Sequence, residues 1–170
     1  MTLSIGETYI MKTLMIYGSN KENRELMDSA ARFYADVLFG ERLARNISIW
    51  VHTSKNLLLK KGMYGSCMPI DDDIRRYPRE FVIHVDSSVP RKMMLETLAH
   101  EMVHAKQFAR GEMRQLWSGK TSWKGEHIDD ELMEYYDHPW EIEAHGRERG
   151  LFIRWINYEG IQNKKWTFDF

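Results

Sequence analysis

The chain has 170 residues, of which 43% are hydrophobic and 29% charged, and its formal net charge is −1 at pH 7. This length and composition predict one globular domain over residues 1–170, with enough apolar side chains for a core. The nearly neutral charge gives no reason to expect a nucleic-acid partner, which a basic face would attract.

The sequence also limits the compartment and the kinds of metal site. The single cysteine, Cys67, excludes an internal disulfide and any zinc ribbon built from several cysteines. No apolar run approaches the ~18 residues of a membrane span. Residues 1–18 lack the charged start and the long apolar core of a signal peptide. We therefore expect a cytoplasmic protein without a membrane partner.

The chain begins with a strand and a helix in this interpretation. Residues 9–17 can form the strand, although their pattern is irregular. Ser19 or Asn20 is a suitable N-cap for a helix that we expect from Lys21 to Phe39, where Gly40 ends it. Apolar side chains recur at helical spacing along it, which predicts a core helix without chemistry of its own.

Three further strands are predicted. Residues 46–53 alternate in polarity and are rich in β-forming side chains, and a short strand is plausible within residues 62–68. Residues 81–86, FVIHVD, give the clearest strand pattern. We expect the edge of this strand to be exposed, so that an extended peptide can pair with it beside the helix that follows.

That helix, between Pro90 and Gly111, contains the sequence HEMVH. His100 and His104 are four residues apart, so they lie one turn apart on one helix face and both imidazoles can reach the same metal ion. Glu101 projects beside this pair. The opposite face is apolar and carries Met94, Leu95, Leu98, Met102, Ala105 and Ala109.

The H-E-x-x-H pattern is short and has an ordinary alternative. In a chain with this content of His and Glu it should arise by chance in roughly one sequence in forty, on a solvated helix face with two unremarkable histidines. A catalytic zinc site usually takes three protein ligands and leaves one position for water. The metal interpretation therefore requires a third ligand from elsewhere in the chain.

After Gly111, a β-hairpin and a second long helix are predicted. Residues 114–126 resemble the hairpin, with Ser118-Gly119 near the turn and a tryptophan on each arm. Asp137, His138 and Pro139 form a capped start for the second helix. This region also supplies the candidates for a third ligand, which are His138, Glu141, Glu143 and His145. A metzincin histidine is absent, because AKQFARG follows the second histidine of the motif.

Helical geometry separates the two glutamates. Glu141 falls on the apolar face together with Ala144 and Trp155, where a carboxylate needs a partner such as a metal ion. Glu143 falls on the opposite side near Arg147, where an ion pair in water is expected. We therefore predict Glu141 as the third ligand. The alternative is an ion pair between Glu141 and a lysine or arginine at the edge of the core.

HEMVH, followed thirty-seven residues after His104 by EIEAH, resembles a gluzincin, in which the third ligand is a glutamate in an E-x-x-A/S-D/N setting on the next helix. The short length, the strand before the motif and the PWEIEA phrase resemble small SprT-like or ImmA/IrrE-like metallopeptidases over residues 81–155. The resemblance implies His100, His104 and Glu141 as zinc ligands and Glu101 as the base. His145 stands where many gluzincins have an acidic residue that supports a ligand, and an imidazole cannot fill that role in the same way.

The resemblance also implies a zincin-like α+β fold. A small mixed sheet would pack on an N-terminal helix and on the H-E-x-x-H helix, and a C-terminal helix would supply the third ligand. We expect a zinc metallopeptidase with a peptide or protein substrate, in which Glu101 deprotonates the attacking water and later protonates the leaving amine. The donor to the oxyanion stays open among Tyr135, Tyr136, His127 and His138.

Two other functions have to be considered. One is a zinc-binding regulatory or interaction protein with little or no general proteolytic activity, or a protease specific for one cognate repressor. Glu101 argues against a site that only binds metal, because zinc binding does not require it. The other is a DNA-associated protease of the fuller SprT type, for which the chain has neither a zinc ribbon nor a basic face.

Overall fold

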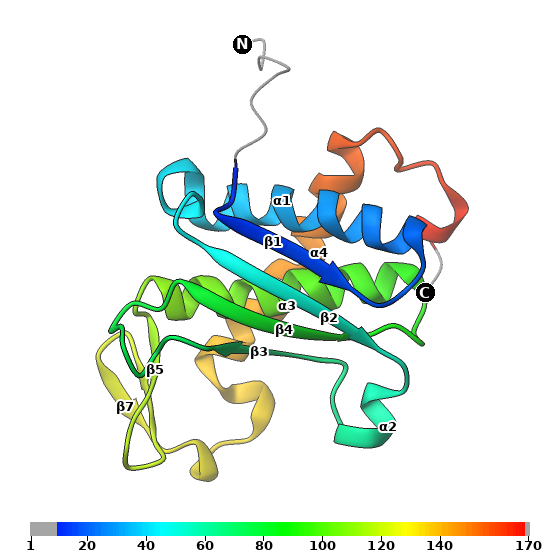
Figure 1. Cartoon of the computed structure of the whole chain (residues 1–170). Coiled ribbons are helices and arrows are strands. Elements are labelled where there is room, and N and C mark those ends of the chain that lie inside the picture. Colours follow the sequence, from blue (N-terminus) through cyan, green and yellow to red (C-terminus); the bar gives the residue numbers. More distant parts are fainter. Residues whose placement is uncertain (1–9, 169–170) are drawn as a thin grey trace.

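The computed structural model describes residues 10–168 and shows a mixed α+β architecture (Figure 1). In chain order its strands and helices are β1 Thr13–Tyr17, α1 Lys21–Ala44, β2 Ser48–Ser54, α2 Leu57–Lys61, β3 Gly65–Pro69, β4 Glu80–Asp86, α3 Arg91–Ala109, β5 Met113–Gln115, β6 Thr121–Trp123, β7 Glu126–Ile128 and α4 Pro139–Tyr158. Short 3-10 helices lie at Asp130–Leu132 (η1), Tyr135–Asp137 (η2) and Lys165–Thr167 (η3).

The main sheet has the strand order β1-β2-β4-β3. β1, β2 and β4 are parallel, and β3 runs antiparallel to β4. α1 and α3 cover one face of this sheet, and α4 packs against α3 (Figure 1). The Tyr34 hydroxyl of α1 donates to the Leu95 carbonyl of α3 across 3.2 Å, which ties the two covering helices together. The inward side chains of β2 and β4 are fully buried, namely Ile49, Val51, Phe81, Ile83 and Val85.

The predictions for the start of the chain are confirmed with small changes. The Asn20 side chain caps α1 by accepting from the Asn23 N–H at 2.8 Å. Gly40 interrupts the helix with a φ of 71°, as its sequence position predicted, but helical turns resume and carry α1 to Ala44. The strand predicted over residues 9–17 is shorter, and its first residue lies outside the described residues.

The expectation of an exposed edge on the strand at 81–86 is wrong. β4 lies inside the sheet, where Ile83 stands opposite Val51 of β2 on one side and Cys67 of β3 on the other. The segment around 62–68 forms the edge strand instead, because after α2 the chain returns antiparallel along β4. The sheet edge nearest to α3 is therefore β3.

α3 is the central helix of the structure. The apolar face predicted for it is confirmed, since all six of its side chains are at most 2% exposed. The opposite face is also buried, because α4 packs against it. His100, Glu101 and His104 consequently lie between layers of the protein and not on a solvated helix face, which removes the ordinary alternative for the motif.

The later elements match the predicted hairpin and second helix in outline. β5 and β6 pair as expected, β7 adds a third strand, and Trp117 lies fully exposed in the turn, so only Trp123 is on an arm. α4 begins at Pro139, but His138 at its N-cap makes no side-chain capping bond. Between residues 10 and 168 no helix combines the length and apolar character needed to cross a membrane.

Candidate metal centre

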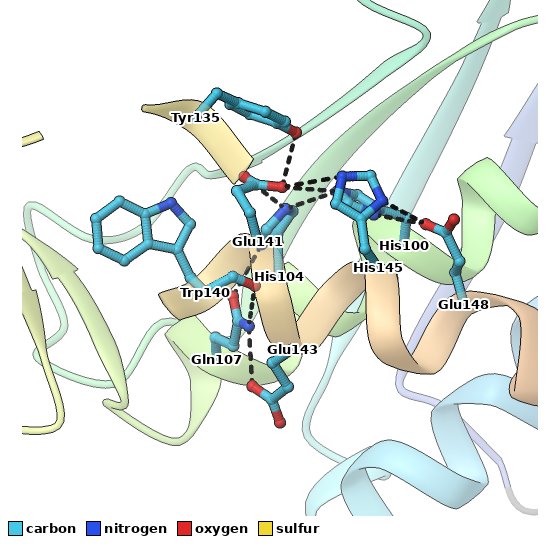
Figure 2. A network of polar contacts seen from close by, with 9 residues as sticks. All are labelled: His100, His104, Gln107, Tyr135, Trp140, Glu141, Glu143, His145 and Glu148. Atoms are coloured by element: carbon cyan, nitrogen blue, oxygen red, sulfur yellow. Dashed lines mark hydrogen bonds and ion pairs between the residues drawn. The ribbon is translucent and has the colours of Figure 1, made fainter. Parts of the chain in front are cut away.

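The side chains predicted as ligands meet between α3 and α4 (Figure 2). The Nε2 atoms of His100 and His104 are 3.1 Å apart. Glu141 places one carboxylate oxygen 3.1 Å from His100 Nε2 and the other 3.3 Å from His104 Nε2. All three side chains are only 9–10% exposed. The helical geometry that selected Glu141 therefore agrees with the structure, while the binding of a metal stays a prediction.

A chain of hydrogen bonds determines which nitrogen of His104 faces the cluster. Gln107 Nε2 donates to the Trp140 carbonyl at 3.0 Å and to Glu143 Oε2 at 2.9 Å. These two bonds orient the amide, so Gln107 Oε1, 2.8 Å from His104 Nδ1, is the acceptor there. His104 therefore carries a proton on Nδ1, and the Nε2 of the neutral ring presents its lone pair to the cluster.

Glu148 orients His100 in the same way. Its Oε2 atom lies 2.8 Å from His100 Nδ1, and because a carboxylate only accepts, the Nδ1–H donates. A carboxylate behind an imidazole is the usual support of a metal-binding histidine. Glu148 was not predicted from the sequence, where the resemblance places such a supporting residue at the position of His145. The signal was present, since Glu148 follows Glu141 by seven residues, about two helical turns, and so shares its face.

With both rings neutral, two nitrogen lone pairs and a carboxylate point at one another, and this arrangement needs a cation. A proton can fill the need. Burial lowers the pKa of His100, but the hydrogen bonds to Glu141 and Glu148 outweigh it and raise that pKa to about 10. Burial likewise opposes ionisation of Glu141, yet the hydrogen bonds from His100 and His104 hold the pKa of Glu141 far below its usual range.

A divalent metal ion is the other cation that fits. In a tetrahedral zinc site with bonds of 2.0–2.2 Å, the ligand atoms stand about 3.3–3.6 Å apart. The separation of the two imidazole nitrogens, 3.1 Å, and the separations of 3.1 and 3.3 Å from them to the two different oxygens of Glu141 lie within a few tenths of an ångström of that range. The donor set and its spacing are thus compatible with zinc.

Glu101 lies beside the cluster with its carboxylate buried and without a hydrogen-bond partner among the described residues. Burial raises the pKa of Glu101 to about 7, although the neighbouring His104 and His100 lower it. A Cβ added to Gly65 of β3 would stand only 2.9 Å from Glu101 Oε1, so the backbone of the edge strand passes directly over this carboxylate. Glu101 therefore lies between the candidate ligands and the sheet edge.

His145 adjoins the same cluster. Its Nε2 atom is 3.9 Å from Glu141 Oε2, and its ring centroid is 4.5 Å from that of His100. His100, Glu141 and His145 form a group that could hold a metal ion, with ligand atoms all within 4.8 Å of one another. The shorter separations to His104 make His104 the better third member of a compact set and leave His145 at its border.

Of the four candidates for an oxyanion donor, Tyr135 reaches the cluster. Its hydroxyl donates to Glu141 Oε2 at 2.7 Å, and burial together with that carboxylate raises the pKa of Tyr135, so the hydroxyl stays a donor. Tyr136 is 73% exposed, and His127 is exposed on β7. His138 turns its Nε2 toward a backbone carbonyl 3.2 Å away.

The expectation that Glu143 makes only a solvated ion pair is wrong. The pair with Arg147 exists at 3.4 Å, but Glu143 also accepts from Lys106 Nζ at 2.8 Å and from Gln107. Burial opposes ionisation of Glu143, yet these hydrogen bonds from Lys106 and Gln107 lower its pKa. The cause is the close packing of α4 on α3, which turns this side of α4 toward the end of α3 instead of toward water.

No protein-family model matches the sequence, and neither a curated protein nor a solved structure gives a match. The resemblance carried by HEMVH and EIEAH therefore stays a prediction.

Competition between protons and metal at this site predicts pH-dependent binding. Despite burial, the hydrogen bonds to its carboxylate partners raise the pKa of His100 to about 10, so this imidazole is protonated at neutral pH in the metal-free protein, and the pKa of His104 is raised as well. Because zinc binds the deprotonated ring, its apparent affinity should rise with pH by about tenfold per unit for each proton released, until the pH passes the raised pKa values.

Calorimetric titration with zinc in two buffers of different ionisation enthalpy measures this release directly. We expect at least one proton per zinc bound at about pH 7. A His138→Ala variant, changed outside the cluster, should release the same number. Zinc affinity that does not change with pH would contradict the tautomers and charges assigned to the cluster.

Proposed function

We propose that the protein is a zinc-dependent metallopeptidase of the gluzincin type, acting on a peptide or protein substrate. The observation that carries the proposal is the convergence of His100, His104 and Glu141 to within 3.3 Å, with the buried Glu101 beside them. Two imidazoles and one carboxylate are a known ligand set of catalytic zinc. Calcium and magnesium prefer shells made of oxygen atoms.

The residues around the cluster have the properties that peptide hydrolysis requires. When bound, zinc would supply Lewis acidity, which makes a water more acidic and polarises a carbonyl. Glu101 takes the proton of the water that attacks the scissile carbonyl and then delivers it to the leaving amine. A pKa raised to about 7 suits both transfers. The Tyr135 hydroxyl, which stays protonated and reaches the cluster, is the candidate donor for the negative charge that develops on the carbonyl oxygen.

The position of β3 supports an extended peptide as the substrate. An extended chain can add to the edge of a sheet through backbone hydrogen bonds. β3 is an edge strand, and its Gly65 lies directly over Glu101. A peptide paired with β3 would therefore pass over the base and alongside the candidate ligands.

The order of the elements supports a zincin-like fold. α1 follows β1 and precedes the other three strands of a small mixed sheet, whose edge strand β3 is antiparallel to its neighbour. α3 carries the histidine pair, and α4 packs against it and carries Glu141. This order matches the arrangement that the resemblance implies.

Metal analysis combined with a cleavage assay tests the proposal. The purified protein should hold about one zinc per chain and should cleave an unfolded protein such as casein, or itself at high concentration, in a reaction that a chelator stops. A His100→Ala, His104→Ala double variant should lose both the zinc and the cleavage. Full zinc stoichiometry in the double variant would overturn the ligand assignment. Zinc binding in the wild type without any cleavage would favour a metal-binding regulatory protein.

A further inference from the structure

His145 has the orientation of a ligand, although it stands at the border of the cluster. Its Nε2 atom faces the cluster, 3.9 Å from Glu141 Oε2, and its Nδ1 atom lies on the other side, 3.4 Å from Glu148 Oε2 (Figure 2). This contact is an ion-pair distance and not a hydrogen bond, and a carboxylate beside Nδ1 favours a proton on that nitrogen. The lone pair on Nε2 of the neutral ring then points toward the site between the other ligands.

One carboxylate thus lies behind two imidazoles. Glu148 Oε2 contacts Nδ1 of His100 at 2.8 Å and Nδ1 of His145 at 3.4 Å. The contact with His100 is a hydrogen bond, which is the support that a metal-binding histidine typically receives, and the same oxygen also lies near His145 Nδ1. A histidine at position 145 that served only the helix surface would not need its Nε2 directed at Glu141.

His145 differs from the other three side chains in its exposure. Its side chain is 39% exposed, whereas those of His100, His104 and Glu141 are 9–10% exposed. A bonding distance to a zinc ion shared with the cluster requires a shift of the ring by about an ångström. The exposed side of the ring also leaves it space to swing away from the cluster.

We propose that His145 is a fourth protein ligand, which closes the metal site at rest with three imidazoles and one carboxylate. The coordination position that hydrolysis needs is then occupied by His145 and becomes available when its ring moves out. The inference rests on the proposed function, because it takes the metal bound by His100, His104 and Glu141 as given. The inference adds a resting state of the enzyme, which is inactive until the substrate or a partner displaces the His145 side chain.

Counting the coordinated histidines tests this inference without an activity assay. The metal-free protein is loaded with Co²⁺, and the proton NMR spectrum is recorded at chemical shifts far outside the normal range. In this region of the spectrum, each imidazole coordinated to Co²⁺ contributes one exchangeable N–H signal. We expect three such signals in the wild type and two in His145→Ala. Alanine is the best helix former, so this substitution at an exposed helical position keeps the fold, which circular dichroism verifies.

A His127→Ala variant is the matched control, because His127 is exposed on β7, outside the cluster, and should keep three signals. Competition with a chelator gives a second measurement, in which zinc affinity should be lower in His145→Ala than in this control, because a ligand is lost. Two signals in the wild type that survive His145→Ala unchanged would overturn the role of His145 alone. The absence of any shifted signal in the wild type would overturn the metal centre itself, and with it the proposed function.

Discussion

Glu101→Gln is expected to lower the rate of substrate cleavage by about 10²–10⁴-fold or more while leaving zinc content and folding nearly unchanged. Glutamine keeps the size of glutamate, so it fits below Gly65, where a Cβ on the edge strand would already stand 2.9 Å from the Glu101 carboxylate. It cannot accept the proton of the attacking water. The loss should therefore appear in the chemical step and not in the binding of metal.

The measurement compares kcat/KM, zinc per chain and thermal unfolding between the wild type and Glu101→Gln. Glu96→Gln is the control, since Glu96 lies on the same helix outside the cluster. Equal cleavage by the wild type and Glu101→Gln would identify a contaminating protease and leave the enzyme proposal without support. A change in stability with no activity to lose would assign Glu101 a structural role.

The pH profile of cleavage gives Glu101 a second signature. The carboxylate must be ionised to take a proton, and burial raises its pKa to about 7 in the metal-free protein. A divalent ion nearby favours the ionised form and lowers this pKa. The rate of the wild type should therefore fall as the pH decreases through a value below about 7, and the residual rate of Glu101→Gln should lack this step.

Features confined to one helix could be predicted from the sequence. The spacing within HEMVH placed His100 and His104 on one face of α3, and the same reasoning placed Glu141 on the buried face of α4. Both predictions succeeded because the helical repeat converts sequence distance into direction without knowledge of the partner.

Features that depend on contacts between elements could not be predicted in this way. The sequence pattern of residues 81–86 is compatible with an edge strand and with an interior strand. The strand is interior because β3 pairs alongside it. The bonds of Glu143 to Lys106 and Gln107 exist because α4 approaches the end of α3 closely. Glu148 shares the face of Glu141, but its partner His100 is on the other helix. The helical repeat of α4 alone could therefore not predict a role for Glu148.

The variants Glu141→Gln and Glu143→Gln should distinguish a metal ligand from a residue that only supports a ligand. Glu141→Gln removes the charged oxygen donor of the cluster, so zinc affinity should fall by more than the 10–100-fold typical of residues behind the ligands. Glu143→Gln leaves the donor set intact and removes one carboxylate partner of Lys106, which keeps Glu112 at 2.8 Å. We expect it to lower the free energy of unfolding by about 1–2 kcal/mol and zinc affinity by about tenfold or less.

Chelator competition measures the two affinities, and urea unfolding of the metal-free proteins measures the two stabilities. The small loss of affinity expected for Glu143→Gln has a defined route, because Glu143 orients Gln107, and Gln107 holds the proton on His104 Nδ1. Arg147→Gln, which removes the outermost contact of Glu143, is the control and should change neither quantity by much. An equal loss of zinc in both glutamate variants would mean that the carboxylate at 141 is not a ligand and that the cluster is a buried network of ion pairs.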